Sequence, residues 1–261
     1  MNILETIIVK KKKEVADSKL RKSIAKLKQG PFFNNETLSF KDFLSRKDKT
    51  GVIAEFKRRS PSKGIINDTS TVAEVTAGYV KYGASAISIL TDEEFFGGSL
   101  NDLSEARINK IPILRKEFII DEYQIIESKA YGADVILLIA ACLSKDEVKR
   151  LSKVAKDIGL NVLLEIHKEQ ELEHICEDID VVGINNRDLK TFKVDINHSI
   201  ELCKKMPSDK IKISESGIDH VKTIRHLKTN GFSGFLMGEK FMKEIDPGKA
   251  FKDFVEELLL R

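Results

Sequence analysis

Residues 131–139, YGADVILLI, share a pattern with residues 82–90, YGASAISIL. Each stretch reads as the end of a helix, a glycine turn and an apolar strand. EDIDVVGI at 177–184 and NGFSGFLMG at 230–238 follow the same pattern. The copies recur about every 49 residues, the length of two strand–helix units, so four copies make eight units. The repeat therefore predicts an α/β fold, a (β/α)8 TIM barrel, in preference to an open doubly wound sheet.

Eight short apolar runs supply the strands of this barrel. They are nearly continuously apolar, as parallel strands are when helices cover one side and the barrel interior lies on the other. Gly83, Gly132 and Gly231 stand where the preceding helix needs a left-handed residue at its end. No glycine-rich dinucleotide fingerprint follows the first strand, which argues against a Rossmann fold. The predicted strands span residues 51–56, 86–90, 111–115, 134–139, 161–166, 180–184, 210–214 and 233–237, and each is followed by a predicted helix.

The first 47 residues carry no strand signal and are predicted to form an N-terminal helical extension of a single barrel domain that spans residues 1–261. Lys10 to Lys13 make a basic turn, which we expect to be a solvated face. A second helix is predicted over residues 37–46, with Thr37 as its capping residue. The first helix is predicted to bury a stripe of Ile3, Ile7, Val15 and Leu20.

The composition is that of an ordinary globular protein. With 41% hydrophobic and 33% charged residues it excludes disordered and collagen-like chains. The net charge of only +3 and the absence of Trp argue against nucleic-acid binding. The three cysteines have no C-x-x-C spacing, so we expect reduced thiols and no metal site. No signal peptide is recognisable and no apolar run approaches the ~20 residues of a membrane span, so we expect a cytoplasmic monomer without membrane attachment.

Chemically capable residues gather where the predicted strands end, and in a barrel the active site is built there. Glu55 and Lys57 end the first strand, and their i, i+2 spacing points both to one face above Ile53. Taken singly, Glu165 reads as a hydrophilic strand end and Lys116 as a surface lysine. Six strands that end this way predict a site instead. The other polar strand-end residues are Arg115, Asn185, Asn186, Arg187, Ser214, Glu215, Ser216 and Glu239.

Aromatic residues and glycines complete the predicted pocket. Phe95, Phe96 and Phe118 follow the second and third strands and predict an apolar wall. Paired charges beside such a wall fit an aromatic anion. The loops after the seventh and eighth strands, SESGI at 214–218 and MGEKF at 237–241, place glycines where backbone N–H groups can approach a phosphate. The alternative is that these glycines serve only the turns.

Five motifs at the strand ends are highly specific when they occur together and in order. They are AEFKRRSPSKG at 54–64, ILRKEFI at 113–119, LLEIH at 163–167, GINNRDL at 183–189 and SESGI at 214–218. With them the chain resembles the indole-3-glycerol phosphate synthase family over essentially its whole length. In that family a helical extension, here residues 1–47, folds against the barrel mouth. Two departures are slight: Phe56 stands where a smaller apolar residue is common, and Glu117 where Asp is usual.

The resemblance implies a carboxy-lyase of tryptophan biosynthesis, a branch of aromatic amino-acid biosynthesis. The substrate would be the anionic aromatic sugar phosphate 1-(2-carboxyphenylamino)-1-deoxyribulose 5-phosphate. Ring closure with decarboxylation and dehydration would give indole-3-glycerol phosphate, with no cofactor and no metal. The loop that carries Arg58, Arg59 and Lys63 is expected to shift over this ligand as a lid.

The resemblance also implies catalytic roles. Lys116 would be the general acid of ring closure, and Glu165 the acid or base of dehydration. Lys57 would be a second cation for the substrate phosphate or a hydroxyl, and Glu55 would hold the lysines in place. The remaining catalytic residues, which would orient sugar hydroxyls and the lysine, are Asn185 and Glu215.

Substrate-binding roles follow in the same way. Arg187 is the implied partner of the anthranilate carboxylate, because its planar fork matches that group. The backbone at Gly217, Gly238 and Glu239 would hold the phosphate, with Ser216 at the sugar end. The implied aromatic pocket is lined by Pro61, Phe96, Phe118, Leu137 and Leu189.

Three other readings stay open at this point. A phosphoribosylanthranilate isomerase would want a Cys base at a strand end, and Cys142 is the one rough candidate in the sequence. A Schiff-base aldolase would use one lysine covalently. A barrel that serves only as a binding or scaffold module would lack the charged strand ends that this chain carries.

Overall fold

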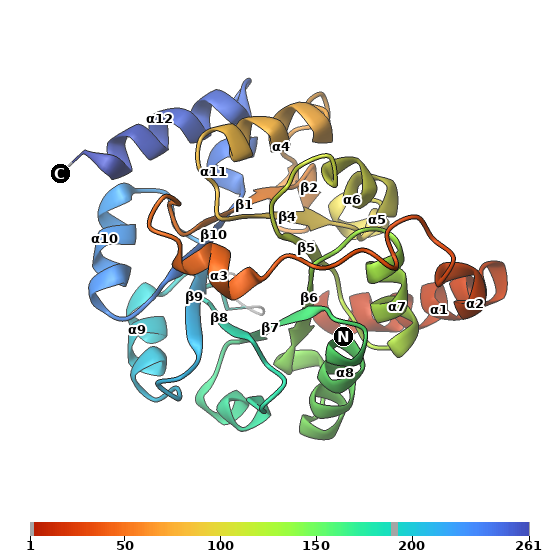
Figure 1. The fold of residues 1–261 in the computed structure, drawn as a ribbon. Coiled ribbons are helices and arrows are strands. Elements are labelled where there is room, and N and C mark those ends of the chain that lie inside the picture. The colour runs from red at the N-terminus through yellow and green to blue at the C-terminus, as the bar shows by residue number, and fades with distance from the viewer. Residues whose placement is uncertain (1–2, 189–192, 261) are drawn as a thin grey trace.

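The computed structural model describes residues 3–188 and 193–260, and eight of its strands form a closed parallel barrel. Around the ring the strands follow the order β1-β10-β9-β8-β7-β6-β5-β4 (Figure 1). The predicted fold class is confirmed, and every predicted strand end lies within two residues of an observed one. The barrel strands are β1 (Val52–Phe56), β4 (Ala86–Leu90), β5 (Ile113–Lys116), β6 (Val135–Ile139), β7 (Asn161–Ile166), β8 (Val181–Asn185), β9 (Ile211–Glu215) and β10 (Gly234–Met237).

Helices surround the ring of strands in Figure 1. Gly83, Gly132 and Gly231 have φ of 92°, 94° and 91°, which confirms the left-handed turns predicted before the strands. After β7 the prediction of an ordinary helix is wrong: Glu169–His174 is a 3-10 turn, because Leu172 is its single large apolar residue. The α-helices are α1 (Ile3–Arg21), α2 (Ile24–Leu27), α3 (Phe40–Ser45), α4 (Val72–Lys81), α5 (Glu93–Phe96), α6 (Leu100–Ala106), α7 (Glu122–Ala130), α8 (Lys145–Asp157), α9 (Ile196–Lys204), α10 (Val221–Thr229), α11 (Glu239–Met242) and α12 (Pro247–Leu259).

The end of the barrel at which the strands begin is filled with apolar side chains. Alternate residues of each strand point inward, and these residues pack in layers across the barrel. Phe40 and Leu44 of α3 join them, and Figure 1 shows α3 lying across the ring. This end is therefore closed, which leaves the opposite end for a ligand. The interior cluster includes Ile53, Leu114, Leu163, Val181 and Ile213.

The helix predicted over residues 37–46 is shorter than expected. It begins at Phe40 because Ser39, and not Thr37, is its cap: the Ser39 Oγ accepts a hydrogen bond from the backbone N–H of Asp42 at 3.3 Å. The Thr37 hydroxyl donates instead to a backbone carbonyl in the turn before β7. The chain before α3 is therefore tied to the closed end of the barrel.

The stripe predicted for the first helix is partly present in α1. Ile7 and Val15 are buried as predicted, but Leu20 is 88% exposed. The prediction of a solvated basic turn is wrong at Lys11, whose side chain is 1% exposed. Ile7, Lys11 and Val15 are each four residues apart, so they lie on one face of the helix and are buried together. The division of the chain at residue 47 stays a prediction.

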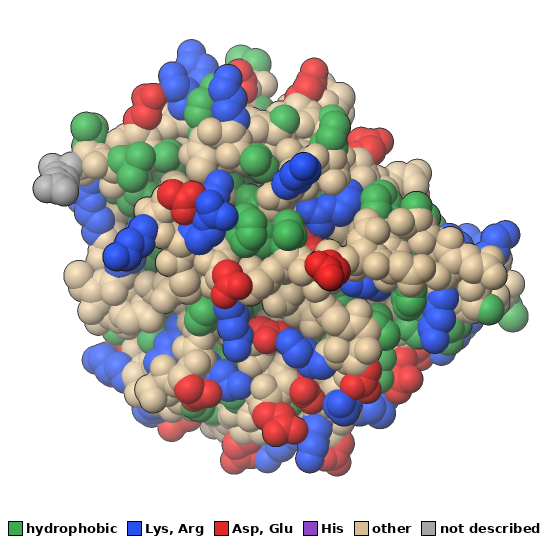
Figure 2. Space-filling view, in the orientation of Figure 1, with side chains coloured by type: hydrophobic (Ala, Val, Ile, Leu, Met, Phe, Trp, Pro, Cys, Tyr) green, Lys and Arg blue, Asp and Glu red, His purple; other side chains and the backbone are tan. Residues whose placement is uncertain are grey.

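The surface and the thiols show nothing unusual within the described residues. On the face seen in Figure 2, basic and acidic side chains are interspersed. Among the helices described, none is both long and apolar enough to cross a bilayer. Residues 3–188 and 193–260 contain no group of His, Cys, Asp or Glu side chains arranged to hold a metal ion. The three cysteines, all within these ranges, form no disulfide.

Candidate active site

A cavity of about 420 Å³ lies at the end of the barrel where the strands finish. The structure brings together here every residue predicted for catalysis or binding except Leu189, which lies outside the described residues. The roles of these residues stay predictions. The predicted residues that line the cavity are Glu55, Lys57, Pro61, Phe96, Lys116, Phe118, Leu137, Glu165, Asn185, Arg187, Glu215, Ser216, Gly217, Gly238 and Glu239.

Strand alternation explains why four charged side chains point into this cavity. Each stands two residues after an apolar residue of the barrel interior, so it projects from the same side of its strand. The charged layer therefore lies directly above the apolar one, next to the open end of the barrel. The apolar and charged pairs are Ile53 and Glu55, Leu114 and Lys116, Leu163 and Glu165, and Ile213 and Glu215.

Lys116, at the end of β5, lies between two buried carboxylates. Its Nζ is 3.3 Å from Glu165 Oε2 and 3.3 Å from Glu215 Oε2. Burial alone would lower the pKa of this ammonium group, but the carboxylates of Glu215, Glu165 and Glu55 outweigh burial and raise that pKa above its ordinary value. Lys116 is therefore protonated at neutral pH and can donate a proton to a ligand in the cavity.

The two carboxylates beside Lys116 differ in protonation. Burial would raise the pKa of Glu165, but Lys116 and His167 bring it below the ordinary value. Burial raises the pKa of Glu215 to about 7, because repulsion from Glu165 offsets the attraction of Lys116. At neutral pH Glu165 is ionised while Glu215 holds a proton part of the time. Two carboxyl groups with separated pKa values suit acid and base roles in one site.

A second ion pair stands beside the first. Lys57 Nζ donates to Glu55 Oε1 at 2.7 Å, and the Ser88 hydroxyl donates to Glu55 Oε2 at 3.4 Å. Burial would raise the pKa of Glu55, but Lys57 and Lys116 hold it below the ordinary value. The Glu55 carboxylate therefore stays ionised between the side chains of Lys57 and Lys116, and it helps to raise the pKa of Lys116.

Two glycines make room for these carboxylates. A Cβ on Gly183 of β8 would lie 2.1 Å from Glu215 Oε1. A Cβ on Gly238, directly after β10, would lie 2.8 Å from Glu55 Oε1. Both distances are shorter than van der Waals contact permits, so any larger residue would push the carboxylate aside. The positions of the two carboxylates thus depend on glycine, which has no side chain, at residues 183 and 238.

The end of β8 contributes two polar side chains to the cavity. Asn185 Nδ2 donates to Glu165 Oε1 at 3.2 Å, and Asn185 Oδ1 accepts from the backbone N–H of Arg187 at 3.0 Å. The Arg187 Nη2 lies 3.8 Å from Glu239 Oε2, a weak contact that leaves the guanidinium able to pair with a ligand. Asn186 has a different task. Its Nδ2 donates to the Ser216 carbonyl at 2.7 Å and supports the turn after β9.

The turns after β9 and β10 border the same part of the cavity. Ser216 and Gly217 have φ of 70° and 68°, in the left-handed region. A Cβ on Gly217 would lie 2.3 Å from Val194 Cγ1, so that position requires glycine. Ser216 is a strained residue for its type, and such strain clusters at functional sites. α11 begins at Glu239, so its first N–H groups border the cavity beside this turn.

One wall of the cavity is apolar. The rings of Phe96 and Phe118 are 6.2 Å apart between centroids, with 38° between their planes. Ile3, Leu4 and Ile7 of α1 also line the cavity, so the N-terminal helix forms part of its mouth. These three residues were not predicted to belong to the site. The available signal was the apolar stripe, which indicates a buried face but not what the face covers.

A model of the family described as indole-3-glycerol phosphate synthase matches residues 4–254. The chain belongs to the indole-3-glycerol phosphate synthase family. The resemblance seen in the strand-end motifs is confirmed, and with it the prediction of a carboxy-lyase of tryptophan biosynthesis.

Relatives named indole-3-glycerol phosphate synthase match along most or nearly all of their length. One from Bacteroides thetaiotaomicron is 46% identical over 258 residues, covering 98% of this chain and 99% of the relative. Another from Thermoanaerobacter pseudethanolicus is 44% identical over 260 residues, covering 98% of each. A solved tryptophan synthase α subunit from Legionella pneumophila has a TM-score of 0.61 at 14% identity, covering 84% of this chain and 96% of that one. At that identity the likeness shows the barrel fold alone.

The movement predicted for the loop after β1 stays a prediction, and the structure shows the contacts that hold this loop. It contains a small hairpin of β2 (Arg59–Ser60) and β3 (Gly64–Ile65). Arg58 pairs with Asp102 of α6 through two hydrogen bonds of 2.6 Å and 2.8 Å, and Arg59 donates to backbone carbonyls of α5. Both arginines therefore contact the outer helices, Arg58 through the Asp102 carboxylate of α6 and Arg59 through backbone carbonyls of α5. Lys63 does reach the mouth, 3.5 Å from Glu239 Oε1.

The geometry disfavours the two other enzyme classes. Burial, with Glu165 and Glu171 nearby, raises the pKa of Cys142 to about 12, and Cys142 is not among the residues that line the cavity. Such a thiol is a poor base for an isomerase. A Schiff-base lysine must be a neutral amine to attack a carbonyl, whereas the pKa of Lys116 is raised. The site therefore suits proton transfer from a charged lysine.

Proposed function

We propose that the chain converts 1-(2-carboxyphenylamino)-1-deoxyribulose 5-phosphate into indole-3-glycerol phosphate, carbon dioxide and water. The observation that carries the proposal is the Lys116 ammonium group, 3.3 Å from each of two buried carboxylates and beside an apolar wall. An acid, a base and an aromatic pocket are the three features that this reaction needs. Family membership supports the same substrate.

In the ring-closing step, the aromatic carbon that bears the carboxylate attacks the ribulose carbonyl. Lys116 donates a proton to the carbonyl oxygen as the new carbon–carbon bond forms, so no free alkoxide develops. Carbon dioxide then leaves from the same ring carbon, and its bonding electrons restore the aromatic ring. Holding the reactants in this geometry lowers the barrier further, because the apolar wall fixes the ring and the charged groups fix the sugar.

In the dehydration step, the intermediate loses one proton and one hydroxide. Glu165 is the base that accepts the proton, because its lowered pKa keeps it ionised at neutral pH. Lys57 is the second cation. Its ion pair with Glu55 holds it at the cavity, where it assists the departing hydroxyl. Asn185 holds the Glu165 carboxylate in place through its 3.2 Å hydrogen bond. Glu215 shares Lys116 with Glu165 and can return the proton that Lys116 has lost.

The two anionic ends of the substrate have separate partners. Arg187 binds the anthranilate carboxylate, since a guanidinium fork matches a carboxylate in shape and charge. Backbone N–H groups at Gly217, Gly238 and Glu239 bind the phosphate, with Ser216 next to the sugar. The unpredicted cations near this phosphate region are Lys240 and Lys243 of the segment after β10.

The proposal is tested by incubating the purified protein with the carboxyphenylamino deoxyribulose phosphate and following the rise of indole fluorescence. We expect product with no added metal or cofactor. The control is substrate without protein under the same conditions. Absence of product at every protein concentration would refute the assignment.

Arg187→Ala tests the carboxylate site separately. We expect KM for the substrate to rise about 10- to 100-fold, the usual worth of hydrogen bonds between charged groups, with a smaller change in kcat. Steady-state kinetics separate the two constants. A variant with an unchanged KM and a lowered kcat would contradict the assignment of Arg187 to the carboxylate.

A further inference from the structure

Lys11 of α1 is a buried ammonium group outside the reaction scheme. Its side chain is 1% exposed, and its Nζ lies 2.8 Å from Asp92 Oδ2, 3.0 Å from Glu117 Oε1 and 2.8 Å from Glu14 Oε2. Burial alone would lower the pKa of Lys11, but Glu117 and Asp92 outweigh burial and raise it. Burying a charge is costly unless it is well paired, so the loss of Lys11 would leave its buried carboxylate partners without a compensating charge.

The two buried partners of Lys11 belong to neighbouring loops at the cavity. Asp92 follows β4, and its Oδ1 accepts a hydrogen bond from the backbone N–H of Phe95 at 2.7 Å, which starts α5. Glu117 follows Lys116 directly, and its Oε1 accepts from the backbone N–H of Phe118 at 2.8 Å. One loop leads to Phe96 and the other carries Phe118. Lys11 therefore joins the two segments that build the apolar wall.

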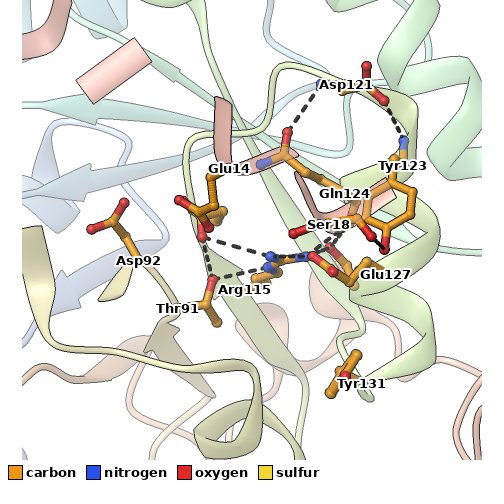
Figure 3. Close-up of polar contacts among 12 residues, drawn as sticks. Glu14, Ser18, Thr91, Asp92, Arg115, Asp121, Tyr123, Gln124, Glu127 and Tyr131 are labelled. Carbon is orange, nitrogen blue, oxygen red and sulfur yellow. Dashed lines mark hydrogen bonds and ion pairs between the residues drawn. The ribbon is translucent and has the colours of Figure 1, made fainter. Parts of the chain in front are cut away.

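The Glu117 end of this network is also held by groups of the barrel. Thr91 donates its hydroxyl to Glu117 Oε2 at 2.8 Å and accepts from Arg115 Nε at 3.0 Å. The Arg115 guanidinium also donates to Glu127 Oε2 at 2.9 Å and to the Gln124 carbonyl at 3.0 Å, both on α7. Figure 3 shows Thr91 joined to Arg115, with Gln124 and Glu127 to the right of Arg115 and Asp92 to the left of Thr91. Lys11 is the cation that α1 adds to this framework.

We propose that Lys11 is a positioning residue for the aromatic half of the substrate. By holding the Asp92 and Glu117 carboxylates close together, it sets the spacing of Phe96 and Phe118 and fastens α1 over the mouth. Without its charge, two buried carboxylates repel each other and the two loops separate. This inference rests on the proposed function, because the wall is assigned to the aromatic ring of that substrate.

The test compares Lys11→Met with the parent protein. We expect KM for the carboxyphenylamino deoxyribulose phosphate to rise about tenfold or more, because a misplacement of ~1 Å can cost on the order of 10²-fold. The inhibition constant of inorganic phosphate should stay within about twofold, since phosphate binds at the far turns. The matched control is Lys19→Met, which removes an exposed lysine of the same helix that pairs with Asp121. The control should leave KM unchanged.

A second variant keeps the test decisive if Lys11→Met unfolds. Lys11→Met combined with Glu117→Gln removes the repulsion between the two carboxylates, so it should fold and recover part of the lost affinity. Recovery of KM in the double variant supports the positioning role. An unchanged KM in Lys11→Met overturns it, as does equal weakening of substrate and phosphate. Failure of the proposed function is distinct, because the parent protein would then form no product.

Discussion

At the scale of single residues, the chemistry depends on which side chains share a proton. Lys116 keeps its charge because two carboxylates lie at 3.3 Å, and those carboxylates differ in pKa because one is more strongly paired than the other. Neither the charge of Lys116 nor the difference in pKa between the two glutamates follows from the residue type alone. Each arises from burial and from neighbours that other strands supply.

Lys116→Ala should lower kcat by about 10²–10⁴-fold, the usual contribution of a well-placed acid. The substitution removes the proton donor but leaves the apolar wall and the phosphate turns. Single-turnover fluorescence measurements check the change. Lys153→Ala is the control, because Lys153 is an exposed lysine of α8 paired with Asp157. Near-normal turnover in the Lys116 variant would show that another group is the acid.

Glu215→Gln tests the pKa of about 7 through stability. The pKa of Glu215 is raised from 4.5 in the folded protein, so its contribution to stability is present below about pH 4.5 and is lost as the pH rises through about 7. A neutral amide escapes this loss. At about 1.4 kcal/mol per pKa unit, the variant should gain up to about 3 kcal/mol relative to the parent between pH 5 and pH 8. Denaturant unfolding across that range measures it, and parallel curves for the two proteins would contradict the raised pKa.

At the scale of elements, four of the barrel strands (β1, β5, β7 and β9) carry an apolar residue inside the barrel and a charged residue two positions later. Strand alternation alone produces this arrangement, so a strand that packs the core also aims its last side chain at the cavity. The arrangement works only where the neighbouring strand leaves space. On β8 that space is Gly183, next to Glu215 of β9.

Gly183→Ala should lower kcat/KM on the order of 10²-fold while the protein stays folded. The added methyl group would lie 2.1 Å from Glu215 Oε1, so the carboxylate must leave its present position, in which its other oxygen pairs with Lys116. Kinetics together with a thermal melt measure both properties. The control is Gly159→Ala, where φ is +80° and the space is open, so strain lowers stability but kcat should not change. Normal activity in the Gly183 variant would mean that Glu215 needs no fixed position.

At the scale of the whole molecule, the two ends of the barrel have different tasks. The end closed by α3 is an apolar core, and the opposite end holds the charged cavity. In this architecture stability and chemistry occupy opposite faces. A substitution at the closed end should therefore affect folding without affecting the reaction.

Phe40→Ala should cost about 3–5 kcal/mol of unfolding free energy, because it empties a fully buried position under the barrel. The kcat at a temperature where the variant is folded should match that of the parent. Denaturant unfolding and steady-state kinetics check the two halves of the prediction. Ile245→Ala, at a fully exposed position, should change stability by less than about 0.5 kcal/mol. A large loss of kcat in Phe40→Ala would show that the two ends are coupled.

The sequence was sufficient for features that depend on neighbours along the chain. Apolar runs marked all eight strands, and Gly83, Gly132 and Gly231 marked the turns before three of them, because strand period and left-handed turns are local properties. The strand-end residues that line the cavity were predictable for the same reason: the carboxyl ends of parallel strands must meet. Local reasoning was wrong at residues 169–174, where a single large apolar residue is too few for an amphipathic helix. It was also wrong at Thr37, because the neighbouring Ser39 caps the helix instead.

Only the tertiary structure decided which charges are buried and which partners they have. Within the basic run of residues 10–13, Lys11 became a buried bridge between two loops, because its two buried carboxylate partners, Asp92 and Glu117, come from positions more than 80 residues away. Arg58 and Arg59 turned to the outer helices for a similar reason. The sequence alone determined the barrel and the ring of charged strand ends. Their protonation, spacing and support were decided by packing, since electrostatic energy depends on distances between residues that the chain order does not contain.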